Sequence, residues 1–86
     1  MTTLALMQTN DLLLIAASTR MLGDGTARRL REQSGLSQTQ VAAVCGVTAA
    51  AVSRWELGER LPRTRAALLY ARLLHRLAGD AVEVSA

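Results

Sequence analysis

The last third of the chain carries the clearest alternation of apolar and polar positions. An apolar residue recurs there every three or four positions, as on one face of a helix: Ala66, Leu69, Leu73 and Leu77. Most charged residues of the same segment fall on the other faces. The pattern predicts an amphipathic helix over residues 64–77, with its apolar stripe against the core. In residues 80–86, apolar and polar residues alternate at successive positions, and this segment is expected to form a flexible tail.

Near the other end, a strongly apolar segment predicts a helix of a different kind. It follows Asn10, which can cap a helix, and runs to Leu22, where a turn signal of two glycines around an aspartate begins. Because its apolar residues face most directions, we expect burial on more than one face, either in its own domain or against another chain. Residues 1–9 show no periodic pattern and are expected to be frayed.

Cap and turn residues divide the middle of the chain into three short helices. Ser37 is placed to cap one of them, with Gln40 as its capping-box partner, and Thr48 is placed to cap the next. Glycines follow each helix, where a left-handed backbone conformation is often needed. The three expected helices cover residues 26–34, 38–45 and 49–57.

These elements predict an all-α fold of five helices in one small domain. Half of the residues are apolar but only 2% are aromatic, a composition that favours packed helices over a sheet. We divide the chain into an N-terminal helix and turn (1–25), a central helical domain (26–79) and the tail (80–86).

Charge is concentrated in the central domain. Its residues 26–79 hold nine arginines against three glutamates, within a chain of net charge +3. A basic block of this kind is typical of a protein that binds a polyanion, although an ordinary solvated surface would show the same excess.

The composition also limits the chemistry and location of the protein. A single cysteine allows neither an intrachain disulfide nor a cysteine zinc cluster, which favours a reducing cytoplasm. The longest apolar run, Leu12–Ala17, is too short to cross a bilayer. His75 has no second histidine near it in sequence, so no metal site is expected. We find no motif for a cofactor or a catalytic group and expect no enzyme.

Residues 27–74 resemble the phage-repressor, Cro-like helix-turn-helix family, also called the XRE family. The resemblance is carried by the segment "RRLREQSGLSQTQVAAVCGVTAAAVSRWELGERLP" and the leucine-rich helix after it. It implies a lambda-repressor-like domain that binds double-stranded DNA, here with an extra N-terminal helix. It also implies a structural ion pair between Arg31 and Glu56.

Helical spacing gives the same motif an inner and an outer face. The apolar residues on either side of the turn should meet across it: Val41, Ala42, Val44, Val47, Val52 and Trp55. That packing leaves four residues of the second helix on the outer face, where such motifs enter the major groove: Ala49, Ala50, Ser53 and Arg54.

This outer face offers few groups for reading bases. Alanine contacts only thymine methyl groups, whereas Arg54 is placed to bond guanine O6 and N7, and Ser53 a base or a phosphate. Alternatively, Ala49 and Ala50 are plain helix formers, and Arg54 is a phosphate contact.

Phosphate contacts are expected at the edges of the motif. The helix start at Gln38 favours an anion, and the resemblance implies a phosphate contact for its side chain. Thr48 is expected to cap its helix and to touch phosphate. Arg60 and Arg63 flank the loop where related proteins clamp the DNA backbone, unless they are simply solvated.

Three other side chains are read as structural. We expect Trp55 in or at the edge of the core, Tyr70 in the core with its hydroxyl exposed, and Cys45 as a small buried residue.

The sequence thus favours a sequence-specific transcriptional regulator of a bacterium or phage, most simply a homodimeric repressor. Dimer contacts are expected in the helix over residues 11–22 or in the last helix and tail. We favour the first, although that helix would equally extend the monomer core. An antitoxin or adaptor that binds a protein such as a toxin or RNA polymerase is the alternative, as is a DNA-coating protein of low specificity.

Overall fold

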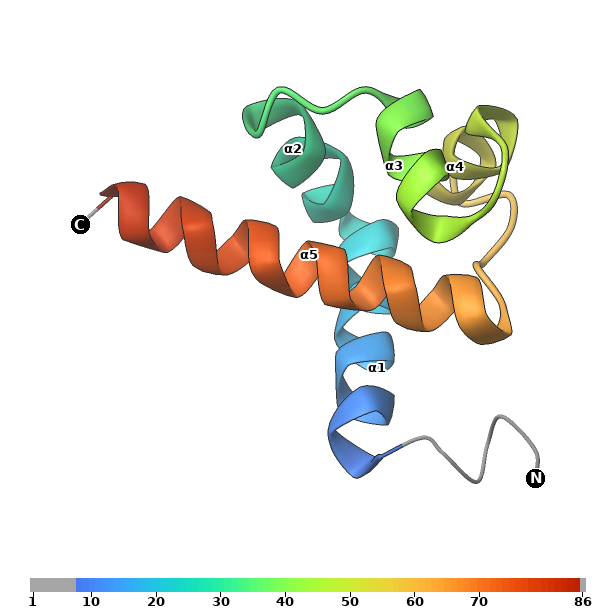
Figure 1. Ribbon diagram of the computed structural model, residues 1–86, viewed down its shortest axis with the longest axis horizontal. Helices are drawn as coiled ribbons and strands as arrows, with labels where there is room; N and C mark the ends of the chain where they lie inside the picture. Colours follow the sequence, from blue (N-terminus) through green and yellow to red (C-terminus); the bar gives the residue numbers. More distant parts are fainter. Residues whose placement is uncertain (1–7, 86) are drawn as a thin grey trace.

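The chain forms five helices in the order expected from its sequence. The computed structural model describes residues 8–85, with side chains for residues 8–79. The helices are α1 (Thr9–Asp24), α2 (Thr26–Gln33), α3 (Gln38–Cys45), α4 (Ala49–Glu56) and α5 (Thr64–Ser85) (Figure 1). The described part of the chain contains no strand, so the fold is all-α, with one helix ahead of the helix-turn-helix.

The capping residues of the two central helices act as their sequence predicts. The Ser37 hydroxyl accepts a hydrogen bond from the Gln40 backbone N–H at 3.0 Å, and the Gln40 side chain accepts one from the Ser37 N–H at 2.8 Å. Thr48 caps α4 by accepting from the Ala51 N–H at 3.1 Å. Gly46 ends α3 with φ 71°, which is a conformation that favours glycine. Local chemistry therefore sets both boundaries of the turn.

Helices α1 and α5 extend further than expected, and α1 ends at Asp24 instead of Leu22. Helix α1 starts one residue before Asn10, because the Asp11 carboxylate reaches back to accept from the Gln8 N–H at 3.1 Å. Helix α5 continues to Ser85, so the expected end near Leu77 and a non-helical tail are wrong for residues 80–85. The single glycine after Leu77, Gly79, costs only about 1 kcal/mol in a helix. The expectation for residues 1–7 falls outside the described residues.

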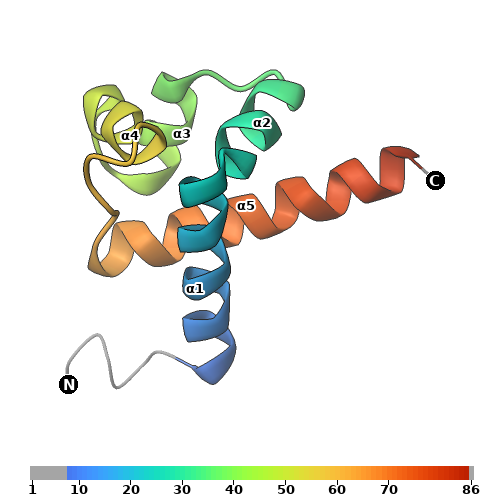
Figure 2. The same cartoon turned by 180° about the vertical axis from the view of Figure 1, so that it is seen from behind.

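Helix α5 is the element against which the other helices pack. Both views show α5 running across the molecule, with α1 crossing it and the α3–α4 pair lying over its N-terminal half (Figures 1 and 2). In the centre, the ring centroids of Trp55 and Tyr70 lie 5.0 Å apart, and the two ring planes are tilted by 54°. The buried apolar core draws on all five helices: Leu22, Ala27, Val41, Ala42, Cys45, Val52, Trp55, Tyr70, Leu74 and Leu77.

Val44 does not join this core. It was expected to pack across the turn with its neighbours, but its side chain is 54% exposed. Val41, Ala42 and Cys45 share the inner face of α3, and helical geometry turns Val44 to the flank. The expectation was wrong because three apolar positions already fill the face that meets α4 and α5.

Helix α1 buries only one of its faces. Asp11, Ser18 and Leu22 are buried, whereas Leu12 and Leu13 are 54% and 63% exposed. An ion pair of 3.3 Å between Asp11 and Arg72 joins this helix to α5. The expectation of burial on more than one face is therefore wrong within the single chain, and two large apolar side chains remain at the surface.

Tyr70 is more deeply buried than expected. It is 2% exposed, and its hydroxyl has no hydrogen-bond partner among the described residues. Burial, which disfavours the charged phenolate, raises the pKa of this hydroxyl. The expectation of an exposed hydroxyl is wrong because the ring stacks inward on Trp55.

Replacing Tyr70 with phenylalanine is expected to leave the protein equally stable or to stabilise it by about 1–2 kcal/mol. The substitution keeps the ring and removes a buried group that lost its water without gaining a partner. Urea unfolding of Y70F beside the parent protein measures this difference. A loss above about 1 kcal/mol would mean that the hydroxyl has a stabilising partner.

Candidate nucleic-acid interface

Helix α4 presents one face to the core and the opposite face to solvent. Val52 and Trp55 are 0% and 3% exposed and anchor the inner face. On the outer side, Ala50 and Arg54 are exposed, one helical turn apart. Ala49 and Ser53 lie beside them and are half-buried, so the structure brings the four expected outer-face residues together on one side of α4.

The Arg54 guanidinium is available for a ligand. No ion pair or hydrogen bond joins it to any other residue of the described range. A guanidinium presents donors in a planar fork, which suits bidentate contact with a base edge or a phosphate. It is the only outer-face side chain of α4 with that capacity, because the neighbouring alanines have no polar atoms.

The turn and the loop after α4 supply further polar groups. The Thr48 hydroxyl oxygen accepts the cap bond, so its O–H hydrogen remains free to donate. Arg60 and Arg63 are exposed on the loop and, within residues 8–79, have no ion-pair partner. These groups are therefore able to meet an anion without breaking contacts within the chain.

A buried carboxylate ties three helices together behind this surface. Glu56 at the end of α4 accepts two hydrogen bonds from Arg31 of α2, at 2.6 and 2.9 Å, and one from Gln38 of α3, at 3.0 Å. Arg31 also donates to the Leu36 carbonyl at 2.9 Å. The Glu56 and Arg31 side chains are only 4% and 13% exposed. The ion pair implied by the family resemblance is thus present, and it fixes α4 relative to the start of α3.

The surroundings keep Glu56 ionised. Burial by itself would raise the pKa of its carboxyl, but the hydrogen bonds from Arg31 and Gln38 and the Arg31 charge outweigh it, so the pKa lies below its ordinary value. The same pairing raises the pKa of Arg31. Both partners therefore carry full charge at neutral pH.

Gln38 has a role that its sequence position did not reveal. One hydrogen of its side-chain amide is engaged by Glu56, which sets the direction of the group. The second amide hydrogen and the backbone N–H groups of Gln38 and Thr39 remain for a phosphate, whereas the Gln40 N–H is taken by the Ser37 cap. The bond to Glu56 depends on residues 18 positions apart, which no local pattern indicates.

This arrangement, two short helices joined at Gly46 with a braced outer helix, agrees with comparison to known proteins. A family model described as helix-turn-helix matches residues 28–76, more than half of the chain. The chain belongs to the phage-repressor-like (XRE) helix-turn-helix family. No curated protein and no solved structure matches it significantly. The helix-turn-helix match makes it a DNA-binding regulator, from a family of regulators and not of enzymes.

The remaining side chains of this helix-turn-helix protein show no metal-ligand cluster. Within residues 8–79, no three His, Cys, Asp or Glu side chains gather in one place. Cys45 is 3% exposed, and burial raises the pKa of its thiol to about 11. None of the described helices is long and apolar enough to cross a membrane.

Proposed function

We propose that this helix-turn-helix protein is a cytoplasmic, sequence-specific repressor that binds a two-fold symmetric operator as a homodimer and occludes a promoter. The observation that carries the proposal is the exposed Arg54 on the outer face of α4, whose guanidinium has no ion-pair partner among the described residues. A helix of this kind places its N-terminal residues against base edges in the major groove. We propose no cofactor and no catalytic role.

Base reading would be divided between one strong contact and several weak ones. Arg54 would bond one guanine through O6 and N7, which carries about 1–3 kcal/mol of discrimination. Ala49 and Ala50 would lie against thymine methyl groups, and Ser53 would bond a base or a phosphate. Because these contacts are few, the shape of the DNA and the pairing of two half-sites would supply the rest of the specificity.

Affinity would come mainly from the phosphates. Arg60 and Arg63 would clamp the backbone on one side of α4, and Thr48 would donate to a phosphate near the helix start. On the other side, the first turn of α3 and the Gln38 amide would meet the strand across the groove. Contacts of this kind position the protein but do not depend on sequence.

The homodimer would form through α1. Leu12 and Leu13 are each more than half exposed on its outer face. Contact with water is unfavourable for apolar side chains, so their burial in a dimer interface would stabilise it. A two-fold axis through this face would bring the same residues together from both copies. The alternative function, an antitoxin or adaptor for a protein partner, is favoured by a different observation: an apolar groove beside α4.

Selection of bound duplexes from a random DNA library tests the proposal. A palindrome with half-sites about one helical turn apart is the expected product. The variant carrying L12S and L13S should recover single half-sites if α1 forms the dimer. Recovery of duplexes without a shared motif would contradict sequence-specific binding and support a DNA-coating role.

Two arginine variants separate reading from anchoring. R54A is expected to lose about 1–3 kcal/mol on the preferred duplex and to accept other bases at one guanine position. R63A is expected to weaken binding to all duplexes and to lower the slope of affinity against salt by about one. Fluorescence anisotropy with the selected duplex and with single-base variants, over a range of salt, measures both. Equal, sequence-independent losses from the two substitutions would show that Arg54 reads no base.

A further inference from the structure

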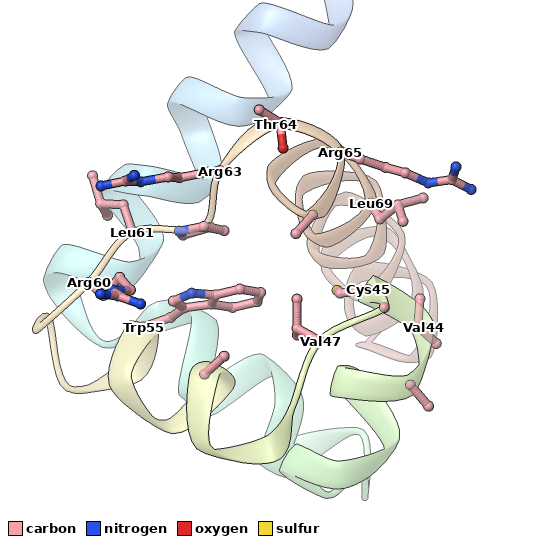
Figure 3. A pocket seen from close by; sticks show the side chains of 15 residues that line it. Val44, Cys45, Val47, Trp55, Arg60, Leu61, Arg63, Thr64, Arg65 and Leu69 are labelled. Atoms are coloured by element: carbon pink, nitrogen blue, oxygen red, sulfur yellow. The ribbon is translucent and has the colours of Figure 1, made fainter. Parts of the chain in front are cut away.

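A groove of about 710 Å³ lies between the end of the helix-turn-helix turn and the loop that joins α4 to α5. Figure 3 shows Arg60, Leu61 and Arg63 along one side of it and Val44 and Arg65 along the other, with the turn and α4 beneath. We call it the loop groove. Ala51 and Trp55 line it from α4, and none of the four outer-face residues of that helix does, so the groove adjoins the proposed DNA face without being part of it.

The walls and floor of the loop groove are largely apolar. Trp55 and Val47 form its floor, and Leu69 closes it from α5 (Figure 3). The walls carry Val44 and Leu61, which are 54% and 53% exposed. Exposed apolar side chains at two edges of a groove with an apolar floor are typical of a surface that another molecule covers.

The rim of the loop groove is strongly basic. Arg60, Arg63 and Arg65 are exposed, and the structure gives none of them an ion-pair partner among the described residues. No acidic side chain lines the groove. The first turn of α5, at Thr64, adds free backbone N–H groups and the positive end of a helix dipole. An occupant of this groove must therefore bring negative charge to its edges.

The backbone at the groove edge is held in an unusual conformation. Thr64 has φ 46°, in the left-handed region that β-branched residues rarely adopt. Strain of this kind persists where the surroundings impose it. Here it accompanies the sharp entry into α5 that separates Leu61 from the helix and leaves the groove open.

We propose that the loop groove docks an acidic, apolar segment of a partner protein, in which apolar side chains are flanked by aspartate or glutamate. The apolar residues would cover Val44 and Leu61, and the carboxylates would pair with the arginines of the rim. A DNA duplex offers phosphates to those arginines but no apolar surface of matching size for the walls. The shape also suits a chain segment, because an open groove leaves much of a small molecule in water.

Docking of such a segment would regulate DNA binding. Arg60 and Arg63 belong both to the rim and to the phosphate contacts proposed above, so one group cannot serve two anions at once. A bound segment would therefore compete with the operator and release it. This regulatory consequence rests on the proposed function, whereas the docking itself does not.

Selection from a library of random 12-residue peptides, without DNA, tests the docking. Peptides that combine leucine, valine or phenylalanine with aspartate or glutamate are expected to be enriched. A synthetic copy of the selected peptide should change the fluorescence of Trp55, the only tryptophan of the chain, because its ring lines the groove. Binding should weaken at least about tenfold in L61S and in R65E, since each removes one kind of contact.

Matched variants locate the site. V44S removes the opposite wall and should repeat the loss seen in L61S, so the result does not depend on one variant folding well. L57S changes a leucine that follows α4 as its C-cap residue, is 64% exposed and does not line the groove, and this variant should bind the peptide as the parent does. Thermal unfolding of every variant checks that the fold is retained.

The outcomes separate this proposal from that of DNA binding. No enriched peptide, enriched peptides without acidic residues, or binding that survives both L61S and V44S would overturn the docking. Each of these results leaves the duplex selection free to succeed. Conversely, groove-dependent peptide binding without a recovered DNA motif would support the docking and remove only the competition with the operator.

Discussion

Glu56→Ala is expected to lower the free energy of unfolding by about 3–5 kcal/mol, which is the usual loss when one partner of a buried ion pair is removed. The substitution would leave the Arg31 guanidinium, 13% exposed, without its carboxylate and would remove the acceptor of the Gln38 amide. Because small domains are stable by only about 5–15 kcal/mol, much of the folded state would be lost at 37 °C. Urea unfolding followed by circular dichroism at pH 7 measures the change.

The Arg28–Glu32 pair supplies the control. Its atoms approach to 3.4 Å, but its side chains are 59% and 51% exposed, so water already solvates both charges. Glu32→Ala should cost only about 0.3–0.5 kcal/mol. Similar losses from the two glutamate substitutions would mean that burial does not set the strength of the Arg31–Glu56 pair.

The same carboxylate should make stability depend on pH. The pKa of Glu56 in the folded chain lies below its ordinary value of 4.5, so its stabilising effect is complete above that pH and is lost as the pH falls through the folded value. The free energy of unfolding of the parent protein should therefore decline below about pH 4.5. Urea unfolding from pH 7 to pH 3 should show a smaller decline for Glu56→Gln.

Trp55→Ala is the other substitution with a large expected effect, a loss of about 3–5 kcal/mol. Trp55 is 3% exposed and stacks on Tyr70 at 5.0 Å, which joins the helix-turn-helix to α5. Its removal takes the largest side chain out of that contact and leaves a cavity that the short helices cannot close. Thermal and urea unfolding by circular dichroism measure the loss.

Two further substitutions decide whether packing is the cause. Trp55→Phe keeps an aromatic ring against Tyr70 and should cost clearly less than the alanine variant. Leu57→Ala changes the residue just after α4, two positions from Trp55 but 64% exposed, and should stay within about 0.5 kcal/mol of the parent. A large loss for Leu57→Ala would point to helix propensity or the helix end, and not to the core contact.

Local signals in the sequence accounted for the turn of the helix-turn-helix. The cap bonds of Ser37, Gln40 and Thr48 each join residues three positions apart, so residue type and spacing suffice to predict them. The start of α1 was missed because Gln8 is not a favoured capping residue, and Asp11 supplies the bond instead. The end of α5 was missed because the alternating apolar and polar residues 80–86, which follow a glycine, were interpreted as a flexible tail and not as a continuation of the helix.

Contacts between distant helices could not be predicted in the same way. The orientation of Gln38 depends on Glu56, and the burial of the Tyr70 hydroxyl depends on how α4 lies over α5. Val44 looked like its apolar neighbours, because sequence alone does not say which flank of α3 remains open. The DNA-reading roles of Ala49, Ala50, Ser53 and Arg54 remain predictions, although their shared face is now a structural fact.

The loop groove had no signal in the sequence at all. Its two sides come from α3 and from the loop before α5, about 17 residues apart, and they come together only in the folded chain. Leu61 and Pro62 read as an ordinary connection. The arginines around them were assigned to phosphate because charge was visible in the sequence, whereas the apolar surface between them was not.

The single thiol of the chain, on Cys45, provides a way to measure opening of the core and ligand binding. With a pKa of about 11, Cys45 is a thiolate in roughly one molecule in ten thousand at pH 7, and its side chain is shielded as well. Alkylating reagents will therefore reach it chiefly in molecules where α3 has parted from the core. The rate at which Cys45 is modified therefore reports how often the core opens. A ligand that binds only the closed form will slow the modification in proportion to the occupancy of the ligand.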